Sequence, residues 1–337
     1  MKHSAAFEAD YQGEQAIWLQ FGSYEAVVLP EIGANLIAFR DRDKGYRFLH
    51  EPELAEMESF KHRAFIHGIP VLFPPNRYED GKFPWNDQTY QFPVNEPQTG
   101  NHLHGFLYDQ PWDVEHFDSH AFESSVSLVF RATQAHSIYT YFPHEFTIKL
   151  TYRLSDSGLQ QQVSVQNHGH APMPCLLAFH TAINAPFAKG STSEDYRVRY
   201  TLGERWELNE RMLPTGKYQE MNHDEARLKQ RVGVSPYFEK MDHHYTARPE
   251  NGRNRMELTD DKEHVTLIYD VGTSYKQWMI WNNDCQSGFF CAEPQMNLVN
   301  APNVHMDPNE IGLISLHQHE IWEETSRIYC IPAVNRV

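Results

Sequence analysis

Alternating apolar and polar residues predict β-strands along much of this chain. The clearest case is residues 146–154, where phenylalanine, isoleucine, leucine and tyrosine alternate with threonine, lysine and arginine. This period of two is typical of a half-buried strand. Asp156-Ser157-Gly158 then predicts a turn, and residues 159–166 predict the partner strand.

Shorter segments of the same character occur elsewhere, while helical patterns are scarce. No amphipathic helix of convincing length, no alternation of strands with helices and no repeat period is visible. We therefore expect an all-β fold of large, stacked antiparallel sheets. The further strands are predicted at 16–21, 24–29, 35–40, 89–92, 122–130 and 275–281, and one short helix at 51–60.

Length and charge restrict the class of protein. The chain has 337 residues, 40% of them hydrophobic, which is enough for a large core. We expect one domain over residues 1–337, since large all-β folds often form a single unit. The net charge of −16 argues against nucleic acid and anionic membrane surfaces as partners. It favours a neutral or polar small ligand.

The four cysteines show no C-x-x-C spacing and lie in or beside apolar runs, so we expect reduced, buried thiols. The first residues lack the apolar core of a signal peptide, and no apolar run approaches about 18 residues. The sequence thus predicts a cytoplasmic protein. It leaves open whether the chain is a monomer or a homodimer.

Glu293 is the first candidate for chemistry. The apolar run 288–292 leads into it, and Pro294, which has no N–H to donate, is expected to end the strand there. A carboxylate would then lie at the end of a rigid element, facing a loop rich in asparagine and proline. The alternative is a solvated glutamate without a function.

His180 and Arg77 are placed in a similar way. An apolar strand at 176–179 leads to His180, where limited solvation makes the pKa tunable near neutrality. Arg77 follows the apolar, proline-rich segment 68–76, which we expect to be a buried extended loop. The alternatives are a core histidine bonded to the backbone and an arginine that pairs with a core carboxylate.

His102 and His104 are two residues apart, so on a strand they would share one face, as in some metal sites. However, the chain has 20 histidines and several such pairs, and no carboxylate follows at the spacing of a cupin-type site. We therefore expect no metal. Two further candidates are Asp242, beside a strand start, and the tryptophans Trp278 and Trp281, of which one could offer a face for stacking on a sugar.

Taken together, these stretches resemble the aldose 1-epimerase (galactose mutarotase-like) family over residues 15–332. The matching pieces, in order, are GIPVLFPPNRYEDGKF, HLHGFLYDQPW, His180, MDHHY and EPQ…NAPN. The resemblance implies a β-supersandwich with a sugar pocket on its concave face and no cofactor. It implies that Glu293 is the general base and His180 the general acid. It also implies that the sugar is bound by Arg77, His104 and Asp242.

The chain departs from the family pattern at two places. Thr181-Ala182-Ile183 follows the acid histidine where Tyr-Phe is usual, and Met296 follows EPQ where threonine is frequent. Both changes are expected to line the pocket, so they bear on which sugar is bound.

The implied chemistry needs only two groups. Interconversion of anomers requires removal of the C1 hydroxyl proton and protonation of the ring oxygen, then ring opening, rotation and closure. One base and one acid on opposite sides of the hemiacetal suffice, each contributing about 10²–10⁴-fold. Two alternatives remain: a phosphosugar epimerase, which would need cations besides Arg77, with Arg63 and Lys82 as candidates, and a non-catalytic sugar-binding protein.

Overall fold

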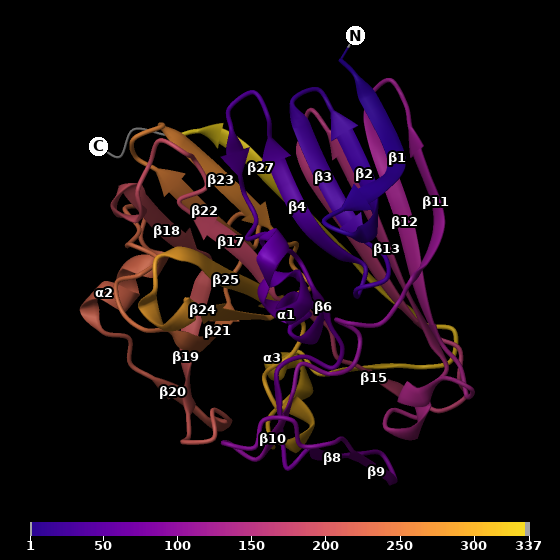
Figure 1. The fold of residues 1–337 in the computed structure, drawn as a ribbon. Coiled ribbons are helices and arrows are strands. Elements are labelled where there is room, and N and C mark those ends of the chain that lie inside the picture. Colours follow the sequence, from indigo (N-terminus) through magenta and orange to yellow (C-terminus); the bar gives the residue numbers. More distant parts are fainter. Residues whose placement is uncertain (1, 334–337) are drawn as a thin grey trace.

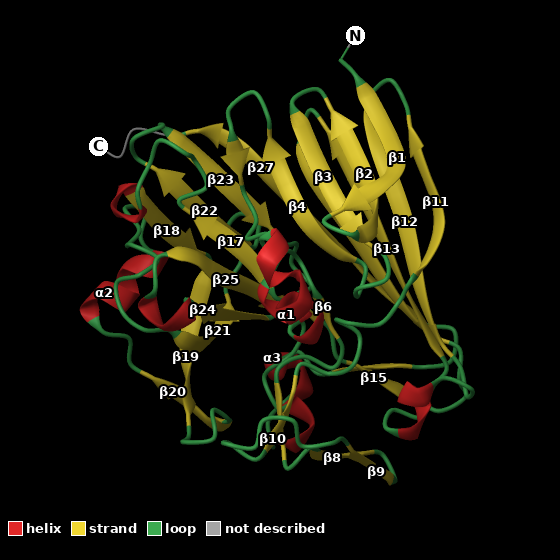
Figure 2. Ribbon diagram, viewed as in Figure 1, coloured by secondary structure: helices red, strands yellow, loops and turns green. Residues whose placement is uncertain are grey.

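The computed structural model describes residues 2–333, and most of its regular structure is antiparallel β-strand (Figures 1 and 2). The all-β prediction is therefore confirmed. Five strands in sequential order form the N-terminal sheet, drawn in indigo and blue in Figure 1. They are β1 (Ser4–Tyr11), β2 (Glu14–Phe21), β3 (Tyr24–Leu29), β4 (Asn35–Asp41) and β5 (Tyr46–Arg47).

Eight strands form the large sheet, in which the N-terminal half of the chain meets its C-terminal end. The predicted pair at 146–154 and 159–166 lies at its centre. In spatial order the strands are β11 (Asp113–Ser119), β12 (Glu123–Ala132), β13 (Phe146–Ser155), β14 (Gly158–Asn167), β27 (Ile321–Pro332), β23 (Val265–Asp270), β22 (Arg255–Asp260) and β18 (Tyr196–Tyr200).

A third sheet, called the site sheet below, carries the functional candidates. Its order is β20 (Pro214–Gln219), β19 (Leu202–Leu208), β21 (Asp242–Ala247), β24 (Gln277–Trp281), β25 (Gly288–Gln295), β16 (Ala178–Phe179) and β6 (Val71–Leu72), and β17 (Thr181–Ala185) also pairs with β25. Three two-stranded ribbons join β7 (Arg77–Glu79) to β10 (Asn101–Leu103), β8 (Lys82–Trp85) to β9 (Gln88–Gln91), and β15 (Met173–Cys175) to β26 (Ile314–Leu316).

The core lies where the large sheet is covered by the other two. The N-terminal sheet packs against β11–β13, and the site sheet covers the β22–β23 side, as Figure 1 shows. On β24, alternation turns Trp278 into this core, where its ring contacts Tyr200 and Tyr269, while Met279 and Trp281 face the opposite side. The opposite face of the site sheet is therefore the one that is free to bind a ligand.

Helices are few and short. The predicted helix at 51–60 begins later than expected, as a 3₁₀ turn followed by α1. None of the helices in residues 2–333 has the length and apolar character needed to cross a bilayer. The α-helices are α1 (Met57–His62), α2 (His223–Ala226) and α3 (Pro308–Ile311).

The prediction that Pro294 ends its strand is wrong. Strand β25 runs through it to Gln295, with Trp278 opposite Pro294 on β24. On the other side the neighbouring strand is itself interrupted between β16 and β17, so no continuous ladder is broken by the missing N–H. Glu293 consequently lies inside a strand, held more rigidly than a strand end would be.

Candidate active site

Four neighbouring strands of the site sheet form the floor of a small cavity. Asp242 begins β21 directly opposite Trp281 on β24, and Met279 on β24 is directly opposite Glu293 on β25. His180 lies in the break between β16 and β17, beside Glu293. Directly opposite residues of antiparallel strands share a face, which brings these side chains together.

Loops from the first third of the chain form the walls. The cavity has a volume of about 200 Å³, below the roughly 300–1,000 Å³ of sites for drug-sized ligands, and so suits a molecule as small as one sugar ring. The lining residues are Arg63, Phe65, Ile66, Asn76, Arg77, Glu96, Leu103, His104, His180, Asp242, Met279, Trp281 and Glu293.

Glu293 and His180 are in direct contact at the bottom of this cavity. His180 Nε2 lies 3.1 Å from Glu293 Oε1, and the exposed fractions of the two residues are only 4% and 1%. The sequence predicts a base and an acid on opposite sides of a sugar, whereas the structure places the two groups side by side. Any ligand that reaches one of them in this cavity also lies close to the other.

Burial changes the ionisation of both groups. Loss of solvation lowers the pKa of His180 to about 3 and raises the pKa of Glu293 well above its usual range, with the nearby Asp242 adding to the latter effect. The positive charge of Arg77 opposes this rise in the pKa of Glu293. Since each charged form is disfavoured alone, the pair holds one proton between them over a wide pH range.

Arg77 is fixed by a carboxylate that sequence reasoning missed. Its Nε and Nη2 donate to both oxygens of Glu96 at 3.0–3.1 Å, and Nη2 also donates to Asp242 Oδ2 at 3.4 Å. Glu96 in turn accepts hydrogen bonds from Thr99 and Asn101. Arg77 thus pairs with carboxylates and lines the cavity as well. Glu96 lies in a loop without periodicity, which is why no pattern pointed to it.

Asp242 is paired with Arg77, and this pairing affects its ionisation. Burial raises the pKa of its carboxyl group, and the neighbouring guanidinium opposes that shift. Asn76 is a second residue that was missed. It is buried, it lines the cavity, and its Oδ1 has no hydrogen-bond partner among the described residues. A buried acceptor of this kind suits a ligand hydroxyl.

His104 reaches the cavity because the backbone changes conformation at this residue, directly after strand β10. It has a left-handed backbone (φ 67°), its N–H donates to Asn76 O at 2.9 Å, and its ring centre lies 5.1 Å from that of His180. The next residue, Gly105, packs so closely that an added Cβ would lie 2.3 Å from Phe73 O. Only glycine fits there, and it brings the histidine loop against the wall.

His102 does not share a face with His104, so that prediction is wrong. The left-handed residue follows the end of the strand, and the ring of His102 instead packs against Phe92 and Phe106, with Nδ1 2.7 Å from Pro93 O. Among residues 2–333, no three His, Cys, Asp or Glu side chains are grouped so that they could hold a metal ion.

The two departures from the family pattern lie away from the cavity lining, contrary to expectation. Thr181 is buried and its Oγ1 donates to Tyr269 OH at 3.1 Å, while the sulfur of Met296 lies 3.7 Å from that of Cys175. Both side chains therefore belong to the packing behind the site. All four cysteines are free, as predicted, although Cys285 and Cys330 are only half-buried.

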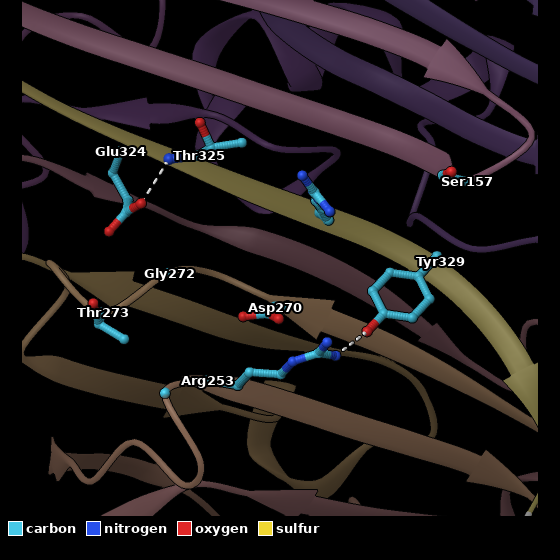
Figure 3. A pocket seen from close by; sticks show the side chains of 10 residues that line it. Ser157, Arg253, Asp270, Gly272, Thr273, Glu324, Thr325 and Tyr329 are labelled. Atoms are coloured by element: carbon cyan, nitrogen blue, oxygen red, sulfur yellow. Dashed lines mark hydrogen bonds between the residues drawn. The ribbon is translucent and has the colours of Figure 1, made fainter.

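A larger hollow of about 720 Å³ lies on the open face of the large sheet (Figure 3). Its walls come mainly from β27, the end of β23 and the turn before β22, and Arg253 donates to Tyr329 OH at 3.3 Å across it. The Glu324 carboxylate at one end accepts backbone N–H bonds from Ser274 and Thr325. Its described lining contains no histidine, whereas the smaller cavity contains His180 in contact with Glu293.

Comparison with known proteins identifies the family. The family profile described as aldose 1-epimerase matches residues 15–329, nearly the whole chain. The chain belongs to the aldose 1-epimerase family. Membership of the aldose 1-epimerase family implies an epimerase, an enzyme of the isomerase class.

Solved structures of this family show the same fold. A galactose mutarotase-like protein from Clostridium acetobutylicum has 32% sequence identity and a TM-score of 0.94, with 98% of this chain and 99% of that one covered. A galactose 1-epimerase from Lactobacillus acidophilus has 16% identity and a TM-score of 0.70, covering 99% and 100%. The predicted galactose mutarotase-like β-supersandwich is thereby confirmed.

A curated relative is more distant. The uncharacterised protein YihR of Escherichia coli strain K12 is 24% identical over 203 residues, which is 60% of this chain. The chain spans about three fifths of that protein's length (59%).

Proposed function

We propose that this chain is an aldose 1-epimerase that interconverts the α and β anomers of a free hexose without a cofactor. The observation that supports it is the His180–Glu293 pair, buried in direct contact at the bottom of a cavity sized for one sugar ring. A protein that only bound sugar would gain nothing from an acid and a base placed together, at the cost of burying both.

The reaction then follows from the positions of the two groups. Glu293 removes the proton from the C1 hydroxyl while His180 donates a proton to the ring oxygen, and the bond between C1 and that oxygen breaks. The open-chain aldehyde rotates about C1–C2. Closure reverses both transfers on the other face of the aldehyde, so that Glu293 returns its proton to the new hydroxyl and His180 recovers its own. No proton is gained or lost.

The remaining polar groups hold the ring hydroxyls. Asp242 and Asn76 offer acceptors, His104 a ring nitrogen, and Arg77 the donors that Glu96 leaves free. Trp281, which is half-buried at the floor, offers an apolar face for the C–H groups of a sugar. Correct orientation of the hemiacetal over the acid–base pair is itself a large part of the rate.

Polarimetry on freshly dissolved single anomers of several hexoses tests the proposal. We expect faster mutarotation with the wild type, and a loss of at least ~10²-fold with Glu293→Gln or His180→Asn, because neither replacement can transfer the proton. Both variants should still fold and bind sugar in calorimetry. Near wild-type rates in Glu293→Gln would contradict the proposed mechanism.

A phosphosugar remains a second candidate substrate because of Arg63. This exposed arginine lies at the cavity 5.6 Å above the Phe65 ring, and no ion pair to a carboxylate is found for it among residues 2–333. Lys82, the other candidate cation, is not part of the cavity lining. If hexose 6-phosphates are preferred, Arg63→Gln should remove the preference while the rates on neutral hexoses stay unchanged; equal effects on both would exclude this role.

A further inference from the structure

We propose that two buried glutamines, Gln295 and Gln277, form with Trp206 a hydrogen-bonded relay that orients the carboxyl group of Glu293 and selects Oε1 as its reactive oxygen. The proposal rests on the proposed function in that it assigns these residues as positioning residues for its general base. None of the three lines the cavity, and each is almost completely buried.

The relay begins at the carboxyl group itself. Glu293 Oε1 faces His180, and Oε2 accepts a hydrogen bond from Gln295 Nε2 at 3.5 Å. Gln295 is two residues further along β25, and residues two apart on a strand share a face. The two carboxyl oxygens therefore have different partners, an acid on one and an amide on the other.

The far end of the relay is fixed independently. Trp206 Nε1 has only a hydrogen to offer, and it donates to Gln277 Oε1 at 2.8 Å. This bond decides which way the Gln277 amide points, because the oxygen must face the indole. Its Nε2 group then faces away from Trp206 and is the only donor that the side chain has left.

The middle link follows from two complementary unpaired atoms. Gln277 Nε2 has no acceptor and Gln295 Oε1 has no donor among the described residues, and the exposed fraction of each residue is 0%. Gln277 and Gln295 are directly opposite each other on β24 and β25. No hydrogen bond joins the two amides in the structure, so this link is part of the proposal. Leaving a buried donor and a buried acceptor unpaired is unfavourable, and a rotation of the amides that brings them together would satisfy both.

With that bond, every donor in the relay points toward Glu293. The order is the indole N–H of Trp206, the amide of Gln277, the amide of Gln295 and finally Oε2. Such chains polarise each link in turn. A donor to Oε2 stabilises the ionised carboxylate against the effect of burial, and it leaves Oε1, next to His180, as the oxygen that takes the proton.

Methionine variants test the relay, because methionine is as long as glutamine but lacks the amide. We expect Gln295→Met to raise the pKa of the Glu293 carboxyl group by about one unit, a tenfold fall in its ionised fraction. The alkaline limb of kcat/KM should move upward by the same amount. Gln277→Met should act in the same direction but less strongly.

The matched control is Gln161→Met, which removes an equally buried amide from β14 in the large sheet, where Gln161 donates to Tyr152 OH. It should change neither quantity. The carboxyl pKa is read by ¹³C NMR of glutamate-labelled protein, with the Glu293 signal assigned by its loss in Glu293→Gln. This readout does not depend on turnover, so absence of anomerase activity in the wild type would reject the proposed function but not the relay.

Two outcomes would overturn the relay. One is an unchanged carboxyl pKa in Gln295→Met. The other is a Gln277→Met variant with a raised KM and an unmoved alkaline limb, which would mean that Gln277 contacts the sugar directly. If Gln295→Met does not fold, Gln277→Met alone decides between these results.

Discussion

Single residues decide how the site responds to pH, because Glu293 and His180 are shifted in opposite directions by the same burial. In solution a glutamate loses its proton near pH 4.3 and a histidine near 6.5. Here the pKa of His180 is about 3 and that of Glu293 is well above its usual range. The order of the two ionisations is therefore reversed.

The reversal predicts a broad pH profile. Below about pH 3 the pair gains a second proton, and Glu293 can no longer act as a base. Above the raised pKa of Glu293 the pair loses its single proton, and His180 can no longer act as an acid. The value of kcat/KM should thus be nearly flat from about pH 5 upward and fall on the alkaline side, where the pH passes the raised pKa of Glu293. A profile with an acid limb near 4.3 and an alkaline limb near 6.5 would show that the usual values survive.

Glu96 gives a second prediction at this scale. Glu96→Gln leaves a neutral partner for Arg77, so the guanidinium loses its charge-assisted bidentate contact and its fixed orientation. We expect KM to rise about tenfold with little change in kcat, since the proposed role of Arg77 is to bind sugar hydroxyls and not the reacting atoms. Glu79→Gln, which alters a nearby surface contact to Arg211, is the control. An unchanged KM in Glu96→Gln would contradict the proposal that Glu96 positions Arg77.

The cavity residues differ in how clearly the sequence points to them. Glu293, His180, Arg77, His104 and Asp242 all lie around it, and each stands in a stretch with a visible pattern or family likeness. Asn76 was passed over although it is adjacent to Arg77. Glu96 could not be found, because its partner lies on another segment and its own loop has no period.

Among the elements, the loop that carries His104 depends most on close packing. Gly105 meets the carbonyl groups of Phe73 and Pro74 at distances that no Cβ tolerates, whereas Gly45, with nearly the same positive φ, has open space around it. Gly45→Ala therefore measures the backbone strain alone. Gly105→Ala adds a steric clash to the same strain.

We expect Gly105→Ala to lower the free energy of unfolding by about 1–3 kcal/mol more than Gly45→Ala does. Denaturant unfolding of both variants measures the difference. The activity of the Gly105 variant should also fall, because the clash displaces the His104 loop. Equal losses of stability in the two variants would mean that the His104 loop can shift to accommodate the added Cβ without further destabilising the protein.

The predictability of elements followed their length. Long alternating strands such as β13 and β14 were predicted within a residue or two, because their pattern repeats many times. β16 has two residues, too few for any period, and the gap beside it is what places His180 next to Glu293. The continuation of β25 through Pro294 was missed because it depends on that same gap in a neighbouring strand.

At the scale of the whole molecule, sheet order joins segments that are far apart in sequence, such as β14 with β27, and no local pattern contains that information.

The packed sheets enclose a large interior, in which several histidines are buried and held neutral. Burial lowers the pKa to about 3 or 4 in His67, His102, His144, His180, His243 and His244.

These histidines predict loss of stability in mild acid. In the unfolded chain each titrates near pH 6.5, so between about pH 6.5 and 4 the unfolded state binds more protons than the folded state, and the free energy of unfolding falls as the pH falls. Each group contributes a slope of up to about 1.4 kcal/mol per pH unit. The thermal midpoint of unfolding should drop clearly from pH 7 to 5.

Two variants test whether the buried histidines cause this drop. His144→Asn should make the drop shallower, because it removes one such group. His62→Asn, at an exposed helix position, should leave the drop unchanged. A midpoint that stays constant from pH 7 to 5 would mean that these side chains take up protons in the folded protein.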